Sequence, residues 1–253
     1  MPNIRAMRLL NALVAGSVTG SQLQTLLSGD GGLLAEWNIL LDRRGQANRL
    51  AGSSAAMTAL AASNTAVDAL VGSANAMKSV ASSSAAMAVA AASSPIMAAI
   101  AASGVLMQTI AASSAAMAAV VASSVAKMAV FNSDTALNAI AASARAMAAC
   151  RAAAQYSVVS WTENGATAVA LTLTGTSHIV MGASRSTIAL RTVTLTTVRS
   201  GSAVSAITPS IGVAALTTGA EVNCAIPIVS TRTAKLSGTG SGTCYLGILR
   251  CDA

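Results

Sequence analysis

The chain has 253 residues, of which 9% are charged and 2% are aromatic, and its formal net charge is +7. Both fractions lie far below ordinary globular usage, whereas alanine and serine are in great excess. This composition is typical of a repeat or fibrous protein rather than of an enzyme.

Residues 1–50 are predicted to be helical. Leucines recur at helical spacing in LLNALVAGSVTGSQLQTLL, a turn is expected at SGDGG (28–32), and LLAEWNILLDRRGQANRL is a second amphipathic stretch. Trp37 and the leucines beside it form one expected buried face. Arginines project from its far end, where they form a solvated helix end or, alternatively, meet an acidic docking surface. The candidate docking residues are Trp37, Arg43, Arg44 and Arg49.

Residues 51–150 repeat with a period of ten. Serine recurs at every tenth position from Ser53 to Ser143 without exception. Four positions after each serine the residue is usually Met, with Lys127 as the one polar exception, and seven positions after it the residue is mostly Leu, Val or Ile. Fixed periodicity of this kind is the signature of a repeat architecture.

The period of ten does not suit one continuous helix. Ten residues turn an α-helix by about 1000°, about 80° short of three turns, so a straight helix would spread the Met stripe around its surface. A supercoil could absorb the drift only with a pitch of roughly 70 Å, about half the usual value. Backbone dihedrals at residues 113–114 distinguish a broken helix from a tightly wound one.

The residue after each serine is usually one that caps helix N-termini, and Pro95 follows Ser94 at a first-turn position where proline is tolerated. We therefore predict that each repeat is a two-turn helix, broken at the serine pair and recapped. The predicted caps are Ser54, Ser84, Ser94, Ser114, Ser124 and Asp134.

A helix of eight residues is not stable alone in water, so each unit must bury its apolar face against neighbouring units or other copies of the chain. Small Ala and Ser side chains allow close approach, and Met fills the irregular space between helices. A homotrimeric shaft is the expected solution. The predicted shaft core is Met57, Leu60, Met77, Met87, Met97, Ile100, Met107, Ile110, Met117, Val120, Ile140 and Met147.

Residues 155–253 change character, since alanine falls and Thr, Val, Ile, Gly and Ser rise. Alternating or β-branched runs at 167–175, 186–198 and 222–236 are separated by turn signals, which favours a β-sandwich or jelly-roll-like knob. The predicted fold class is thus a multi-part α+β fibre with a helical N-terminal region, a shaft of short helices and a β-rich knob. The boundary is expected near Arg151–Tyr156.

No catalytic, cofactor-binding or metal-binding residues are predicted. The one histidine, His178, lies outside any nucleophile motif. The acidic residues of the C-terminal region, Glu163, Glu221 and Asp252, are too scattered to indicate a glycosidase. The basic residues there are scattered among almost no aromatic ones, so nucleic-acid binding is not expected either.

Free buried thiols are the expected state of the four cysteines, disulfides are the alternative, and the sequence does not choose a pairing. None of them has the CxxC spacing of a zinc or redox site. They are Cys150, Cys224, Cys244 and Cys251.

No membrane span is predicted, although no charged residue lies between Lys78 and Lys127. Serines interrupt that segment every ten residues and alanine dominates between them, whereas a spanning helix needs about 20 mainly large apolar residues. The stretch LLNALVAG after Arg5 and Arg8 is interpreted as an amphipathic helix rather than a secretory signal.

Strings such as SSAAMTALAAS, ASSSAAMAVAAAS and ASSAAMAAVVASS resemble the Ser-x-x-Ala-Met-x-Ala-Val/Ile decapeptide repeats of tailed-bacteriophage fibre and virion proteins. EWNILLDRRGQANRLAGSSAAM is similar to the segment that leads into such repeats, and the resemblance covers roughly residues 33–150. It implies a homotrimeric fibre on the virion, an extracellular particle, in which residues 1–50 attach to other neck, tail or capsid proteins.

Within that class, the short shaft favours a neck or collar fibre (a whisker). A tail fibre whose knob binds a host surface receptor is the alternative. A bacterial surface adhesin with a stalk is a rival from another class, and it should carry an export signal or membrane anchor. An ice-binding protein is a third reading, which would need its serines on one flat face.

Overall fold

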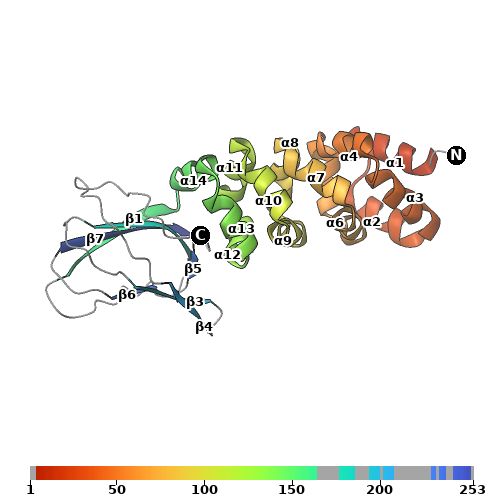
Figure 1. Cartoon of the computed structure of the whole chain (residues 1–253). Coiled ribbons are helices and arrows are strands. Elements are labelled where there is room, and N and C mark those ends of the chain that lie inside the picture. Colours follow the sequence, from red (N-terminus) through yellow and green to blue (C-terminus); the bar gives the residue numbers. More distant parts are fainter. Residues whose placement is uncertain are drawn as a thin grey trace. The chain divides into compact units, whose positions relative to one another are not determined.

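The computed structural model describes residues 4–163, 177–185, 194–199, 202–207, 229–231, 234–237 and 242–251. In these residues, helices occupy the chain as far as Arg151 and strands begin at Tyr156 (Figure 1). The chain divides into two compact units, Met1–Ala129 and Val130–Ala253.

Each decapeptide forms one helix of seven to nine residues, as predicted. Ser113 lies in the extended region, with φ −111° and ψ 115°, so the helix is broken there and a continuous helix is excluded. The helices are α1 (Ile4–Val14), α2 (Gly20–Gly29), α3 (Gly31–Leu41), α4 (Arg44–Ala51), α5 (Ser54–Ala61), α6 (Asn64–Gly72), α7 (Ala74–Ser82), α8 (Ser84–Ala90), α9 (Ser94–Ala102), α10 (Gly104–Ala111), α11 (Ser114–Ala122), α12 (Ser124–Phe131), α13 (Asp134–Ala141) and α14 (Ala144–Arg151).

In the first unit, each helix packs against the helix three places further along the chain. The helix α7 contacts α4 and α10, α8 contacts α5 and α11, and α9 contacts α6. Three decapeptides therefore make one coil of about thirty residues, and successive coils stack as in a helical solenoid. We call this repeating layer of three helices a coil.

The core of the solenoid comes from three positions of each repeat. The residues three, four and seven places after the serine are inward: in the ninth helix these are Ile96, Met97 and Ile100, each 0% exposed. The first of these positions is Ala in most repeats, which lets adjacent helices approach closely. Because consecutive coils of one chain bury the Met face, a trimer is not required to cover it.

The N-terminal helices form the first coil of the same solenoid. The helix α1 contacts α4 and α5, α2 contacts α5 and α6, and α3 contacts α6. Gly16, with φ +71°, follows α1 in a backbone conformation that favours glycine. Gly20 lies where α2 meets α5, since a Cβ built on it would be 2.9 Å from the Ala59 carbonyl oxygen.

The expected two amphipathic stretches of residues 1–50 are thus four helices. The predicted turn at 28–32 is confined to a break at Asp30, whose carboxylate accepts a hydrogen bond from the Leu33 N–H and caps α3. Leu33, Trp37, Leu40 and Leu41 are buried together with side chains of the core, as their spacing predicts.

In the second unit, α13 and α14 are followed by antiparallel strands. The described strands pair in the orders β1-β7-β2-β5 and β4-β3-β6. They are β1 (Tyr156–Glu163), β2 (His178–Arg185), β3 (Thr194–Arg199), β4 (Ser202–Ile207), β5 (Val229–Thr231), β6 (Ala234–Ser237) and β7 (Gly242–Arg250).

The predicted change from helix to strand is confirmed among the described residues, where the last helix ends at Arg151 and the first strand begins at Tyr156. Part of the predicted strand at 186–198 forms β3, and part of that at 222–236 forms β5 and β6. The predicted strand at 167–175 lies outside the described residues.

Truncating one Met of the core tests this packing. Met97 is 0% exposed, so Met97→Ala is expected to lower the free energy of unfolding by about 2–5 kcal/mol through lost burial and the cavity left behind. The volume-conserving control Met97→Leu should cost less than about 1.5 kcal/mol. Urea unfolding followed by circular dichroism gives both values, and equal effects of the two substitutions would contradict a packed core.

Candidate functional site

The most regular feature of the molecule is the serine that opens each repeat. From Ser53 to Ser143, its backbone is extended, with φ from −129° to −99° and ψ from 109° to 124°. Its hydroxyl oxygen accepts a hydrogen bond from the backbone N–H three residues later, at 3.2–3.4 Å in nine repeats. Each of these serines is therefore the N-cap of its helix. We call it the hinge serine.

The caps were expected one residue later, and that expectation is wrong. Ser54, Ser84, Ser94, Ser114, Ser124 and Asp134 are the first helical residues rather than the caps. The first helical position tolerates many residue types, which explains why it varies among Ser, Asn, Ala, Gly and Asp, whereas the hinge position is always Ser. The invariance of serine at the hinge position is the sequence signal that indicates the cap.

The hinge serines also bond to the preceding coil. The Ser83 hydroxyl donates to the Ala51 carbonyl oxygen at 2.6 Å, and the Ser123 hydroxyl donates to the Ala91 carbonyl oxygen at 2.5 Å. Each acceptor lies 32 residues earlier, at the C-terminal end of a helix. One hydroxyl thus satisfies an orphan N–H of its own helix and an orphan carbonyl of another.

In the second and third repeats, side chains of the preceding segment replace the carbonyl acceptors. The Ser63 hydroxyl donates to the side-chain oxygen of Gln24 at 2.9 Å, and the Ser73 hydroxyl donates to the carboxylate of Asp42 at 2.7 Å. Ser63 and Ser73 are buried, so these bonds satisfy groups that water does not reach. The first coil is therefore joined to the repeats by the same serine chemistry.

All of the predicted shaft-core residues are buried, from Met57 at 0% to Met147 at 7% exposed. Lys127, which occupies the Met position of its repeat, is also buried at 1% exposed. Burial of an ammonium group is costly unless it is compensated. This repeat thus departs from the apolar pattern inside the core rather than at the surface.

The candidate docking residues separate into two groups. Trp37 is 0% exposed and belongs to the core of the first coil, so it cannot contact a partner, contrary to expectation. The expectation arose because an isolated Trp among leucines suits either a core or an interface. Arg43, Arg44 and Arg49 are exposed.

Among the described residues, two of the four cysteines are free thiols. Cys150 and Cys251 are free and buried, and burial raises the pKa of the Cys150 thiol to about 12. Such a thiol is unreactive at neutral pH. Cys244 lies in β7 opposite Trp161 and Arg185, and Cys224 lies outside the described residues.

The residues considered for catalysis are not brought together in the described parts of the chain. His178 begins β2 opposite Arg250, and Glu163 ends β1 opposite Gly242. Glu221 and Asp252 lie outside the described residues. No group of three or more His, Cys, Asp or Glu side chains that could hold a metal ion occurs among the described residues.

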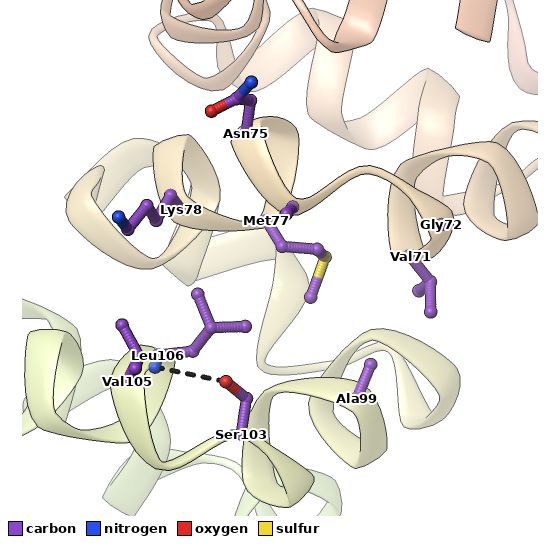
Figure 2. Close-up of a pocket in the computed structure, with 10 residues that line it drawn as sticks. Val71, Gly72, Asn75, Met77, Lys78, Ala99, Ser103, Val105 and Leu106 are labelled. Atoms are coloured by element: carbon purple, nitrogen blue, oxygen red, sulfur yellow. Dashed lines mark hydrogen bonds between the residues drawn. The ribbon is translucent and has the colours of Figure 1, made fainter.

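A pocket of about 400 Å³ lies between two coils of the first unit, where the α6–α7 connection faces α9 and α10 (Figure 2). Figure 2 shows the side chains of Val71, Met77 and Leu106 around it, and the Ser103 hydroxyl engaged by the Leu106 N–H at 3.4 Å. The pocket is lined mainly by apolar groups, and its polar Ser103 already caps α10. Asn75 and Lys78 are the other polar residues that line it.

Among the described residues, no single helix is long and apolar enough to cross a membrane. Two bent helix pairs, Ser84–Ala90 with Ser94–Ala102 and Gly104–Ala111 with Ser114–Ala122, meet the length and composition requirement only jointly.

No known protein family matches the chain. No curated protein matches it significantly either.

Replacing hinge serines tests their double role. Ser83→Ala removes both the cap of α8 and the bond to Ala51, and should lower the free energy of unfolding by about 1–3 kcal/mol. Ser93→Ala is the matched control, because Ser93 makes no side-chain cap hydrogen bond, and its cost should be clearly smaller. Equal thermal unfolding midpoints for the two variants would contradict the assigned role.

Proposed function

We propose that the chain is a non-enzymatic structural protein of a tailed-bacteriophage particle, a fibre whose shaft is a decapeptide solenoid. The observation that carries the proposal is the unbroken series of serine-capped short helices, which in the first unit stack as successive coils. Each further coil lengthens such a stack by about 8–10 Å, the usual separation of packed helices. Length is thus set by repeat number, which suits a spacer.

The resemblance of the decapeptides to phage fibre repeats supports the same proposal. Within it, a neck or collar fibre is the first candidate, because the shaft has only ten repeats. Residues 1–50 are the proposed attachment region, and the β-rich C-terminal part is the proposed distal knob, built as a β-sandwich or jelly roll. A fold of that kind does not by itself define an activity.

A tail fibre that contacts a host surface receptor is the second candidate. It is favoured by the antiparallel strands that follow the helices, since such strands can carry binding loops. The bacterial adhesin stalk is the rival from another class.

The homotrimer remains part of the proposal, but burial of the Met face no longer requires it. Contacts between C-terminal parts or between outer shaft surfaces would have to hold three chains together. The solution mass of the full chain, 24.8 kDa as a monomer, tests this point separately.

Labelling of particles tests the function. Antibody raised against the full chain should bind tailed phage particles produced from the genome that carries the gene. It should label the neck if the protein is a collar fibre, and the tail tip if it is a receptor-binding fibre. Electron microscopy with gold-conjugated antibody gives the position, and preimmune serum is the control. Signal confined to the bacterial envelope would contradict the proposal and favour the adhesin.

A further inference from the structure

The first coil and the helix α4 that contacts it carry a group of exposed arginines, and the carboxylates of the same segment bond to other groups. Residues 4–52 contain five arginines and three carboxylates. Arg5 binds two of these carboxylates, with its guanidinium 2.7 Å from Asp30 and 3.0 Å from Glu36. The third, Asp42, accepts the Ser73 hydroxyl at 2.7 Å.

Among the described residues, no carboxylate lies within ion-pair distance of the remaining arginines. The pKa of the Asp30 carboxyl is held below its usual range by the Leu33 N–H and by Arg5, so Asp30 is committed to this local structure as an anion. The remaining arginines, Arg8, Arg43, Arg44 and Arg49, are all exposed.

Hydrogen bonds place one of these arginines, Arg49, beside α1. The Arg49 guanidinium donates to the Asn11 side-chain oxygen, 38 positions away, and the Ser53 hydroxyl donates to the Val14 carbonyl oxygen, 39 positions away. Since both contacts have nearly the same offset, α1 and the segment from α4 to the start of α5 run in the same direction. An offset of 38 also places Arg8 level with Gln46.

One of the four arginines is held in position by uncharged side chains. Arg49 is held between Gln46 at 3.3 Å and Asn11 at 3.0 Å, both neutral, so its charge is positioned without being neutralised. Arg43 and Arg44 lie at the start of α4, a helix of eight residues and about 12 Å in length. We call Arg8, Arg43, Arg44 and Arg49 the arginine seam.

We propose that the arginine seam, which α1 and the α4 segment carry, is a docking surface for an acidic protein partner. This inference rests on the proposed function, in which residues 1–50 attach the fibre, and it supplies the chemistry of that attachment. Arginine forms bidentate bonds to carboxylates and is enriched in protein interfaces. Ile4 and Ile39, 55% and 52% exposed on α1 and α3 of the first coil, offer apolar surface of the kind that accompanies such contacts.

A protein partner is favoured over nucleic acid by the lack of stacking groups. Trp37 is the only aromatic residue in residues 1–50, and it is fully buried. The contrast with the shaft is also clear, because residues 79–126 contain no charged side chain. Charge-guided docking would therefore occur at the arginine seam rather than along the helices α8 to α11.

Binding of the full chain to a glutamate-rich peptide, compared with a neutral Gln-for-Glu peptide and a short DNA duplex, tests the proposal. Arg44→Glu should weaken peptide binding at least about tenfold, since it reverses a charge in the seam. It should leave folding intact, because a carboxylate in the first turn suits the helix dipole. Lys78→Glu, an equal charge change at an exposed position on α7, should stay within about twofold of the parent chain.

Equal weakening by Arg44→Glu and Lys78→Glu, or no preference for the acidic over the neutral peptide, would overturn the proposal. Tighter, Arg44-dependent binding of the duplex would overturn it in favour of nucleic acid. Arg43→Glu provides a second variant should Arg44→Glu misfold. If antibody labels phage particles but the acidic peptide does not bind, only the docking chemistry is overturned. If the peptide binds but no phage particles are labelled, only the phage assignment is overturned.

Discussion

The hydroxyl of the hinge serine is the interaction on which the solenoid depends. A serine oxygen can accept one hydrogen bond while its proton is donated to another group. In Ser83 and Ser123 these two capacities join the start of one helix to the end of a helix one coil earlier. Aspartate could cap the helix but not donate, and alanine could do neither, so serine suits both roles at Ser83 and Ser123.

The two-turn helices follow from the same constraint. A helix broken every ten residues has many orphan backbone groups and little stability of its own. Stacking on the coils before and after it supplies both the buried surface and partners for those groups. Alanine precedes the Met position in most repeats and keeps those helices close. The flexible Met fills the space between helices, and Met97 is fully buried with Ile96 and Ile100 of the same helix. The first coil extends this arrangement with Gln24 and Asp42 in place of backbone acceptors.

The sequence predicted the short helices, the break at serine and the inward Met positions, because all three follow from a period that can be counted. It did not predict the coil of three, since a ten-residue period does not reveal which helix packs on which. Residue preference alone predicts a cap at Ser114, whereas the invariance of the preceding serine indicates the actual cap, Ser113. Trp37 was ambiguous between core and interface until its neighbours were known, and the pairing of Arg5 with Asp30 and Glu36 joins residues 25 and 31 positions apart.

A distance between two adjacent coils tests the account most directly. Ala88 and Ala118 are exposed at equivalent positions of α8 and α11, which pack against each other. Spin labels placed there through unnatural amino acids should lie within about 10–20 Å, since packed helices are about 8–10 Å apart. A continuous helix would separate the thirty-residue interval by about 45 Å, and a measured distance of that size would contradict the solenoid.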